Sequence, residues 1–351
     1  MARRVRGLAA HAAGRPLAEW DFERRDLRPD DLAVRITYCG ICHTDLHAWH
    51  GEPAYGDTFP LVPGHEFVGE VTAIGDAVSG FTVGDAVAVG NIVDSCGVCE
   101  MCTGGHEQFC DEFPTLTYGG IDRRDGRPTH GAYSTEYVVT EGFAYHLPDG
   151  LDAAGVAPLM CAGITVWEPI EQWKVGPGMS VGVVGLGGLG HLAVKFASAL
   201  GAEVDLFTTS PAKAHAARRL GVRRVVVSTD SEQMAEARNR YDFIIDTVAV
   251  AHDLSGYSLA LKYGGTLCLV GALESTSVNP LTMLGRNLTV AGGGGRPATR
   301  RMLQFAAEHG ISADVEVLPT SAIGDAFDRL ARNDVEFRFS LDVAQLTQDG
   351  T

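Results

Sequence analysis

A glycine-rich turn at residues 185–190, with the sequence GLGGLG, limits the fold of this chain more than any other segment. It lies between a short β-branched run, Ser180–Val184, and a segment from Leu189 to Leu200 whose apolar residues recur at the spacing of one helical face, with Gly201 placed to end that helix. Glycines spaced G-x-G-x-x-G between a strand and an amphipathic helix let the backbone approach a pyrophosphate, which the N-terminal end of the helix then binds. The segment therefore predicts a dinucleotide-binding fold with a doubly wound parallel sheet. A tight strand–helix turn without a ligand is the alternative.

Beyond this turn the chain continues to alternate strand-like and helix-like segments. Further strands of the same sheet are expected at Glu203–Phe207, Arg224–Val227, Phe243–Thr247, Thr266–Gly271 and Leu288–Ala291. Apolar residues gathered on one side predict helices at Tyr257–Leu261 and Arg300–His309. The last run, Val335–Val343, is interpreted as a strand that returns to the first domain.

The N-terminal part of the chain has a different pattern. Between about residues 6 and 141, short β-type runs are separated by Gly, Pro and Asp, and they are Leu32–Tyr38, Phe67–Ile74, Ala86–Val89 and Tyr133–Val139. This pattern predicts a compact, partly barrel-like β domain. A chain of 351 residues suits two domains. We expect an α/β protein with one domain at 1–160 and 297–351 and the other at 161–296.

The charge balance and the cysteines narrow the function classes. The chain has 28 Lys and Arg against 44 Asp and Glu, and this net charge of −16 argues against nucleic acid or an anionic membrane as the main partner. The basic N-terminus lacks a secretory apolar run, and the longest apolar stretch, about 180–200, is interrupted by glycines, His191 and Lys195, so it does not predict a membrane span. Eight cysteines in such a chain indicate metal ligands sooner than disulfides, and we expect a cytoplasmic protein.

Four of the cysteines lie close together in a lobe at about residues 91–115, in the pattern Cys96-x-x-Cys99-x-x-Cys102-x₇-Cys110. Four soft ligands so close in sequence can close a tetrahedral zinc site with no position for a substrate, which is the arrangement of a structural zinc. Ordinary thiols or disulfides are one alternative. An iron–sulfur cluster is another, but the bacterial run ends in a three-residue gap and a proline, whereas Asp111 follows the last cysteine here.

The other ligand-type residues lie in two short motifs and one distant cysteine. Residues 42–47 (CHTDLH) bring together a thiol, a hydroxyl, a carboxylate and two imidazoles, and residues 64–66 (GHE) follow. Cys42, His65 and Cys161 would make a Cys₂His set, and three protein ligands with one open position is the arrangement that a catalytic zinc requires. We therefore expect two zinc ions per chain, one catalytic and one structural, in a nicotinamide-dependent oxidoreductase.

The end of the second predicted strand bears on which nicotinamide cofactor is used. An NAD site usually has Asp or Glu about 20 residues past the glycine motif, where it accepts hydrogen bonds from the ribose. Here Thr209 occupies that place, within a segment, 208–213, that offers three hydroxyls and a lysine to a 2′-phosphate. Asp205 is discordant, since it could serve NAD if the strand ended four residues earlier. We expect NADP(H).

Together these motifs resemble those of the zinc-containing medium-chain dehydrogenase/reductase superfamily, and in particular its cinnamyl alcohol dehydrogenase-like, NADP-dependent alcohol dehydrogenases. The resemblance extends nearly from end to end and is carried by residues 39–47, 64–66, 161–165, 185–190 and 207–210. It implies a GroES-like, β-rich catalytic domain, a Rossmann nucleotide-binding domain, and a homodimer joined through the nucleotide domains.

The resemblance also implies roles for residues near the metal. Cys42, His65 and Cys161 would hold the catalytic zinc. Asp45 would orient His65 and fix its tautomer, and Glu66 would lie behind the metal. Two further residues, Thr44 and His47, would pass a proton from the substrate oxygen through the cofactor ribose to solvent. A local hydroxyl cap and a surface histidine are the alternatives for these two.

For the cofactor, the resemblance places His43 near the pyrophosphate and Thr165 near the nicotinamide. The full set of cofactor-binding candidates is His43, Thr165, Gly185, Gly187, Gly188, Leu189, Gly190, Thr208, Thr209, Ser210, Lys213, Thr247 and Val270.

One stretch departs from the family pattern. Close relatives usually carry a glycine–serine pair and a bulky aliphatic residue where this chain has four glycines at 292–295, followed by Arg296 and Pro297. That stretch normally passes the nicotinamide and the substrate. Candidates for the substrate pocket, chosen by their nearness to the motifs, are Trp49, Asn91 and Met283.

Two cysteines remain outside these sets. Cys39 forms a C-x-x-C pair with Cys42 and could be read as a redox dithiol, but we interpret it as structural because Cys42 is needed by the metal. Cys268 lies in an apolar run and is expected in the core.

The expected reaction is reversible hydride transfer between NADP(H) and a primary alcohol or aldehyde of aromatic, cinnamyl or medium aliphatic type, with aldehyde reduction as the cellular direction. A related reductase that acts on an activated C=C or C=N bond is one alternative, and intact zinc ligands and relay residues argue against it. A non-enzymatic zinc-binding module is a second alternative, which would leave the nucleotide fold unexplained.

Overall fold

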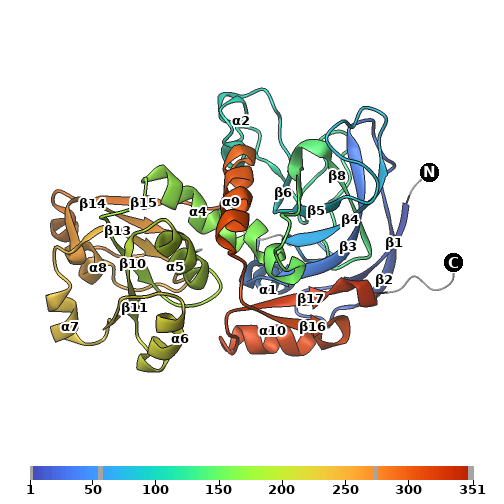
Figure 1. Ribbon diagram of the computed structural model, residues 1–351. Helices are drawn as coiled ribbons and strands as arrows, with labels where there is room; N and C mark the ends of the chain where they lie inside the picture. The colour runs from blue at the N-terminus through green and yellow to red at the C-terminus, as the bar shows by residue number, and fades with distance from the viewer. Residues whose placement is uncertain (1–2, 54–57, 272–275, 347–351) are drawn as a thin grey trace. The chain divides into compact units, whose positions relative to one another are not determined.

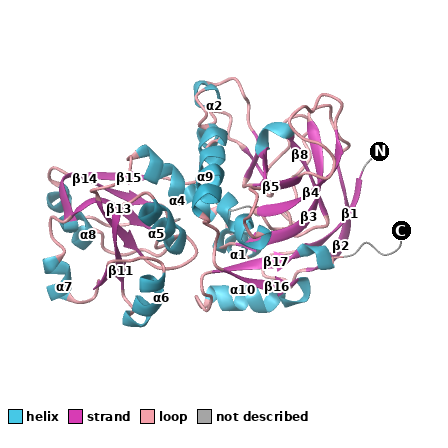
Figure 2. Ribbon diagram, viewed as in Figure 1, coloured by secondary structure: helices cyan, strands magenta, loops and turns pink. Residues whose placement is uncertain are grey.

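The computed structural model of the chain describes residues 3–53, 58–271 and 276–346. The chain forms two compact units, which we call unit 1 (residues 1–161 and 294–351) and unit 2 (residues 162–293). Their helices and strands are drawn in Figures 1 and 2. The expected boundaries differ from these at two places. Cys161 belongs to unit 1, where it contacts His65. Residues 294–296 also belong to unit 1, where Arg296 binds Glu107.

Unit 1 is built on a seven-stranded sheet in the order β16-β17-β3-β4-β5-β9, with β8 paired to β3. All its strand pairs are antiparallel except β16 with β17. The strands are β3 (Asp31–Ile41), β4 (Phe67–Ile74), β5 (Ala86–Val89), β8 (Glu136–Thr140), β9 (Ala144–His146), β16 (Val315–Pro319) and β17 (Arg338–Asp342). The predicted return of the C-terminal strand is confirmed, because β17 pairs with β3.

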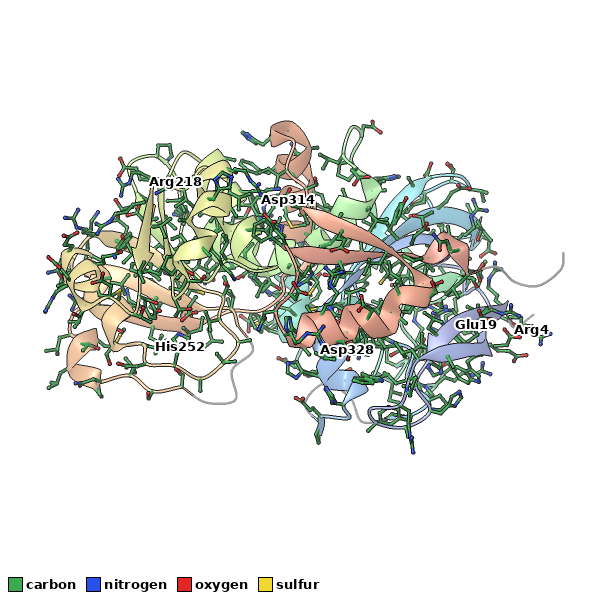
Figure 3. All side chains as sticks on the ribbon, turned by 90° about the horizontal axis from the view of Figure 1, so that it is seen from below. Arg4, Glu19, Arg218, His252, Asp314 and Asp328 are labelled. Atoms are coloured by element: carbon green, nitrogen blue, oxygen red, sulfur yellow. The ribbon has the colours of Figure 1, made fainter. Side chains whose placement is uncertain are left out.

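Two smaller sheets and several helices complete unit 1. The ribbon of β1 (Arg3–Ala9) and β2 (Ala18–Arg24), on which Figure 3 labels Arg4 and Glu19, was not predicted. The other two-stranded sheet pairs β6 (Ile92–Asp94) with β7 (Thr115–Leu116). The helices are α1 (His43–Trp49), α2 (Glu100–Thr103), α3 (Ala153–Val156), α9 (Arg296–His309) and α10 (Ile323–Ala331).

Unit 2 is a six-stranded parallel sheet in the order β12-β11-β10-β13-β14-β15. Its strands are β10 (Ser180–Val184), β11 (Glu203–Thr208), β12 (Arg224–Val227), β13 (Tyr241–Asp246), β14 (Leu261–Leu269) and β15 (Asn287–Val290). Its helices are α4 (Ala162–Gln172), α5 (Gly190–Ala199), α6 (Ala214–Arg219), α7 (Ser231–Glu236) and α8 (Ser255–Ala260). Counted along the unit, this is the order 3-2-1-4-5-6 of a doubly wound dinucleotide-binding sheet, so that prediction is confirmed.

Each unit has its own apolar core. In unit 1, most of the long strand β3 is buried, including Leu32, Ala33 and Val34 in succession, and Arg35 is its one exposed residue. In unit 2 the central strands β10, β11 and β13 are mostly buried, and their apolar runs, such as Val181–Val184, reflect that position.

Most strand predictions agree with the structure, and β4, β5, β10 and β12 have the predicted bounds. Three strands differ more: β14 begins at Leu261, which was predicted to end a helix, and the strands predicted from Val335 and Tyr133 begin only at Arg338 and Glu136. The clearest case is the segment predicted at Tyr133–Val139. Its first residues bend away from the ladder, because Tyr133 N donates to Pro63 O.

Within the described residues no single helix is long and apolar enough to cross a membrane. One bent pair, 153–160 with 162–172, passes by length and composition only, and its residues are mostly buried inside the protein.

Candidate functional site

Cys42, His65 and Cys161 are far apart in sequence and meet in unit 1. Cys42 is the N-cap of α1, His65 precedes β4, and Cys161 follows the short helix η4 (Ala157–Met160). Their ligand atoms lie within 4.8 Å of one another, and His65 Nε2 is 3.2 Å from Cys161 Sγ. Two thiols and an imidazole at this spacing fit the three protein ligands of a tetrahedral divalent metal with one position left open.

Asp45 holds the ring of His65 in one orientation. Its buried carboxylate accepts hydrogen bonds from His65 Nδ1 (3.0 Å), from the backbone N–H groups of Cys42 (2.9 Å) and Gly64 (3.0 Å), and from the Tyr133 hydroxyl (3.2 Å). With Nδ1 held by Asp45, His65 directs Nε2 toward Cys161, so that loss of the Nε2 proton leaves the tautomer that binds a metal.

The pKa values of Cys42, Cys161 and His65 are shifted in different directions by burial and by their contacts. A hydrogen bond with Cys161 lowers the pKa of Cys42 well below its ordinary value in spite of burial, and Arg338 and His65 add to this effect. The same hydrogen bond, together with burial, raises the pKa of Cys161. Burial opposes a charge on His65, but the Asp45 carboxylate outweighs it and raises the pKa of His65 well above its ordinary value. A metal ion at this point would displace these shared protons.

Glu66 lies beside the same cluster and is paired with an arginine that was not predicted. Both of its carboxylate oxygens bind Arg338, at 3.1 and 2.7 Å, and both side chains are buried. Burial raises the pKa of Glu66 to about 7, although Arg338 opposes this. A side chain at Gly40 would overlap the Glu66 carboxylate, so the glycine leaves room for it. The pair keeps a carboxylate close to the thiols without leaving its charge uncompensated.

The candidate relay residues lie on α1 beside Cys42. Thr44 Oγ1 is 3.6 Å from Cys42 Sγ, so the hydroxyl is adjacent to a candidate metal ligand. His47 Nδ1 pairs with Glu52 at 2.9 Å, and this carboxylate was not anticipated. His43 lies in the first turn of the same helix, where burial and the nearby Arg338 and His47 lower its pKa despite the opposing effect of Cys42. His43 is therefore a neutral imidazole near pH 7.

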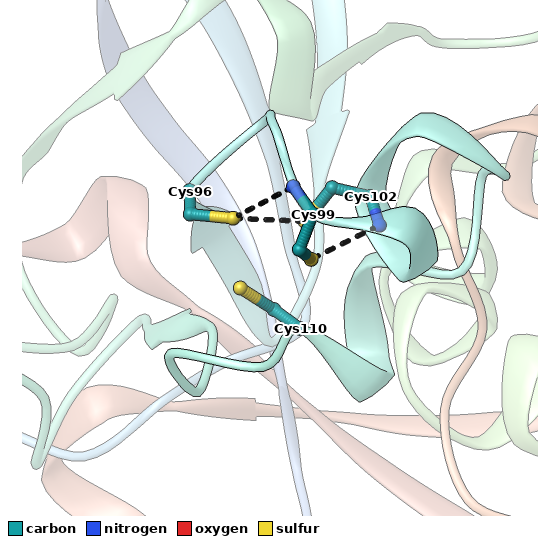
Figure 4. Close-up of side chains that lie close together, drawn as sticks. All are labelled: Cys96, Cys99, Cys102 and Cys110. Atoms are coloured by element: carbon teal, nitrogen blue, oxygen red, sulfur yellow. Dashed lines mark hydrogen bonds between the residues drawn. The ribbon is translucent and has the colours of Figure 1, made fainter.

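The four-cysteine lobe also brings its sulfurs together. Figure 4 shows the four side chains pointing toward one another, and their Sγ atoms lie within 4.8 Å. Thiolates bound to one tetrahedral zinc at about 2.3 Å are about 3.8 Å apart, and Cys96 Sγ is 3.8 Å from Cys102 Sγ. Backbone N–H groups of Cys99 and Cys102 donate to Cys96 Sγ and Cys99 Sγ at 3.4 Å, which favours thiolates. The donor set fits a closed Cys₄ zinc site.

The cysteines are free thiols in all eight positions, so the disulfide alternative is wrong. Cys268 is buried in β14 as expected. Cys39 is also fully buried, and burial raises its pKa well above its ordinary value, which disfavours a reactive thiolate there.

In unit 2 the glycine turn lies between β10 and α5. Gly185 has a positive φ of 86°, which favours glycine, and a side chain at Gly190 would overlap Gly185 O. These two glycines therefore let the first turn of α5 pack directly on the end of β10. Gly187 has no heavy atom within 4 Å of where its Cβ would be, so the backbone is open to a close ligand.

The neighbouring strand ends lie around this turn. Thr247 Oγ1 donates to Val184 O at 2.8 Å, and Val270 N donates to Asp246 O at 2.8 Å, so both candidates follow the carboxyl ends of strands. Dinucleotides bind outside the carboxyl ends of such strands, where the strand order reverses between β10 and β13. In α4 of the same unit, Thr165 Oγ1 accepts from Gly293 N at 3.3 Å.

The residues that follow β11 form a compact polar turn. Thr208 Oγ1 accepts from Ser210 N at 3.1 Å, and Thr209 is exposed. Lys213 Nζ donates to Leu186 O at 3.0 Å, which links this turn to the glycine turn. The lysine and the hydroxyls thus lie together in the turn at the carboxyl end of β11.

Asp205, the discordant carboxylate, is only 1% exposed and lies inside β11, which continues to Thr208. Its oxygens accept from Arg223 at 3.0 Å and from the Tyr241 hydroxyl at 2.8 Å. The strand therefore does not end early enough for Asp205 to reach a ribose.

The three pocket candidates lie in different surroundings. Trp49 Nε1 donates to Arg15 O at 2.6 Å while its ring packs on Phe327, and Asn91 O accepts from Thr117 N at 2.9 Å. Met283 ends the short helix η6 (Pro280–Met283) of unit 2. An unanticipated ring, Tyr118, contacts His65 edge-on at 5.6 Å.

Comparison with known proteins gives concordant matches to both units. The family model described as the alcohol dehydrogenase GroES-like domain matches residues 28–149, and that described as zinc-binding dehydrogenase matches residues 188–308. Aldehyde reductase YahK of Escherichia coli is 44% identical over 349 residues, which cover 98% of this chain and 99% of that protein.

Two solved structures are similar over almost the whole chain. The cinnamyl alcohol dehydrogenase SbCAD4 from Sorghum bicolor has a TM-score of 0.95 at 40% identity, covering 99% of this chain and 100% of that one. The cinnamyl alcohol dehydrogenase from Helicobacter pylori, solved in complex with NADP(H), has a TM-score of 0.91 at 33% identity, covering 98% and 99%.

Proposed function

The chain belongs to the zinc-containing medium-chain dehydrogenase/reductase superfamily, and we propose that it is an NADP(H)-dependent alcohol dehydrogenase that acts mainly as an aldehyde reductase. The observation that carries the proposal is the Cys42–His65–Cys161 cluster, with one position open and with Asp45 holding His65 in the metal-binding tautomer. Primary aldehydes of aromatic, cinnamyl or medium aliphatic type are the proposed substrates, which accords with the names of the relatives.

In this proposal Cys42, His65 and Cys161 hold a catalytic zinc. When bound, the metal supplies a Lewis acid that polarises the carbonyl of an aldehyde or acidifies the hydroxyl of an alcohol. The chain's contribution is to keep the donors in place: Asp45 orients His65, and the Glu66–Arg338 pair supplies a charge-compensated, buried wall.

Thr44, His47 and Glu52 move the proton that accompanies hydride transfer. Thr44 Oγ1, beside Cys42, is placed to hand a proton to or take one from the substrate oxygen. His47 is partly exposed and its Nδ1 is held by Glu52, so its ring can exchange that proton with solvent. The cofactor ribose would connect the two side chains.

The four cysteines of the lobe would bind a second, structural zinc. Their four sulfurs leave no position for a substrate, and the backbone N–H groups directed at them favour the thiolate form. We propose that this zinc supplies folding free energy to the lobe and takes no part in the chemistry.

The preference for NADP(H) over NAD(H) rests on the turn after β11. Thr208, Thr209, Ser210 and Lys213 offer hydroxyls and an ammonium group to a 2′-phosphate. Lys213 uses one donor on Leu186 O and keeps two for a ligand. Asp205 does not compete there, because its carboxylate binds Arg223 and the Tyr241 hydroxyl.

We further propose a homodimer joined through unit 2. Strand β15 is at the end of its sheet, and within residues 3–53, 58–271 and 276–346 only one of its edges is paired with another strand of that sheet. Leu281 and Val290, each 72% exposed, and Leu284, 70% exposed, are apolar side chains in and just before this strand that a partner could cover. Eight free thiols suit a reducing compartment, which supports a cytoplasmic location.

A substrate screen with matched cofactors tests the proposal. Purified protein, with its metal content measured, is assayed with aliphatic, benzylic and cinnamyl aldehydes and either NADPH or NADH. The expected result is carbonyl reduction that is faster with NADPH. Faster turnover with NADH would refute the cofactor assignment, and reduction of a C=C bond with the carbonyl left intact would refute the reaction.

A further inference from the structure

The four-glycine segment at residues 292–295, where the chain departs from the family pattern, is tied down at both of its ends. It joins β15 of unit 2 to α9 of unit 1. At the unit 2 end, Ala291 N donates to Leu269 O at 3.0 Å and Gly293 N donates to Thr165 Oγ1 at 3.3 Å. Consecutive glycines have the largest backbone freedom of any residues, so the path of this segment depends on such ties.

At the unit 1 end the tie is made by the four-cysteine lobe. A side chain at Gly295 would overlap Gly105 O and come within 2.6 Å of Glu107 Oε2. Glu107 then binds the next residue twice, since Oε2 accepts from Arg296 N at 2.8 Å and Oε1 accepts from Arg296 Nε at 2.6 Å. Because the φ of Gly295 is −77°, its glycine serves close approach and not an unusual backbone conformation.

Glu107 also caps the N-terminus of helix α9. The N-cap of α9 is Gly295, which has no side chain to accept from the first N–H groups of the helix. The Glu107 carboxylate accepts one of them and puts a negative charge at the positive end of the helix dipole. The carboxylate is 1% exposed, so this contact is shielded from water.

The lobe in turn holds Glu107. It begins the short helix η2 (Glu107–Phe109), and the next residue after that helix is the candidate ligand Cys110, whose N–H donates to Glu107 O at 3.1 Å. On the other side, Gly105 N donates to the carbonyl of the ligand Cys102, also at 3.1 Å. The backbone on both sides of Glu107 is therefore hydrogen-bonded to a cysteine of the lobe.

We propose that Glu107 is a positioning residue, through which the four-cysteine lobe fixes the start of α9 and the path of the 292–295 segment, and so supports the hydrogen bond that Gly293 N donates to Thr165 Oγ1. This inference rests on the proposed function, since it takes Thr165 to contact the nicotinamide end of NADP(H). It gives the lobe a part in cofactor binding in addition to its part in stability.

The test compares a graded series at position 107 with a matched control. Glu107→Leu removes both acceptors, Glu107→Gln keeps one, and Arg296→Met removes the side-chain donor while leaving the lobe unaltered. Glu112→Gln is the control, because Glu112 is a carboxylate of the same lobe that binds Arg123 at 2.9 Å instead of the segment. For each full-length protein we would measure zinc per chain, amide hydrogen exchange of peptides that cover residues 288–299, and NADPH affinity by fluorescence.

The expected result is faster exchange in residues 291–296 and NADPH binding weakened about tenfold in Glu107→Leu, the loss of a hydrogen-bonded charge pair being of that size. Glu107→Gln and Arg296→Met should fall between this variant and the wild type, with zinc retained and the control unchanged. The proposal is overturned if exchange and affinity stay at wild-type values in Arg296→Met and Glu107→Gln, or if Glu112→Gln has the same effect. Should wild-type protein fail to bind NADPH, the proposed function is wrong, whereas the exchange data still decide whether Glu107 holds the segment.

Discussion

The two cysteine clusters of unit 1 are built in opposite ways. The lobe takes its four thiols from fifteen consecutive residues, 96–110, and backbone N–H groups of the same segment point at the sulfurs. The Cys42–His65–Cys161 cluster takes its ligands from three segments and adds buried side chains from still others, including Tyr133 and Arg338. A local cluster depends on spacing, whereas a dispersed one depends on the whole fold of the unit. The local cluster should therefore chiefly stabilise, and the dispersed one should chiefly react.

The largest expected effect separates these two roles directly. Cys161→Ser should lower turnover about a thousandfold, because Lewis-acid stabilisation of the reacting oxygen is worth several kcal/mol. The change in melting temperature should be small. Steady-state kinetics and metal content measure both effects, with Cys268→Ala as the control, since that thiol lies in the core of unit 2. Full activity in a Cys161→Ser protein that lacks one zinc would remove the cluster from the mechanism.

The next largest effect should be on stability instead of turnover. Cys110→Ser should reduce the free energy of unfolding by on the order of 3 kcal/mol, because a structural zinc contributes its binding energy to folding. Urea unfolding with zinc analysis measures the loss, and the same experiment on Cys161→Ser gives the contrast. Equal destabilisation by the two variants would show that the local and dispersed clusters do not divide their roles in this way.

A smaller effect is expected from the carboxylate that surrounds the dispersed cluster. Asp45→Asn keeps the size of the side chain but weakens its hold on His65 Nδ1, and outer partners of metal ligands are typically worth ten- to a hundredfold in metal affinity. Competition with a chelator should release one zinc sooner from this variant and leave the lobe zinc in place. Release of both ions together would mean that the clusters are not independent.

The smallest effect is a difference in pH dependence within the zinc-depleted protein. N–H groups of Asp111 and Cys102 lower the pKa of Cys99 to about 6, so its alkylation by iodoacetamide should fall off as the pH drops through 6. Burial raises the pKa of Cys102 to about 12, and this thiol should stay unreactive at pH 8. Mass spectrometry of the labelled peptides gives both profiles. Identical profiles for the two cysteines would show that the backbone of the lobe does not set its thiol chemistry.

The same contrast explains what could be predicted from the sequence. The lobe could be predicted from the spacing of its cysteines, and the glycine turn from its spacing together with the strand and helix on either side, because in both cases the interacting groups are neighbours in sequence. The parallel sheet of unit 2 was predicted from the alternation of strands and helices after residue 180, whereas its strand order came only from the structure.

The distant partners named by the family motifs, such as Cys161 and His65, were predicted, but other partners from distant segments were not. Arg338 lies in a strand that was predicted, but nothing near it in sequence indicates that it will meet Glu66. The hydroxyl of Tyr133 on Asp45 and the link from Glu107 to Arg296 are likewise made only by tertiary folding. Asp205 shows the reverse case: a carboxylate close to the expected place was ambiguous until Arg223 and Tyr241 were seen to occupy it.

The β1–β2 ribbon was missed for a different reason. Its two strands are rich in charged residues such as Arg3, Arg6 and Glu23, and they lack the continuous apolar run that made other strands visible. Cross-strand ion pairs such as Arg6 with Asp21 contribute to it instead.

Only two stretches of backbone connect the units, and each starts from a different cysteine cluster. One leaves at Cys161, the residue directly before Ala162, and the other enters at Gly294, one residue before the glycine that packs on the lobe. The two connections are thus held independently, one at the Cys42–His65–Cys161 cluster and the other at the four-cysteine lobe. If a chelator removes the two metal ions one after the other, we expect the two connections to loosen in the same order. The connection that a protease cuts first would then show which ion left first.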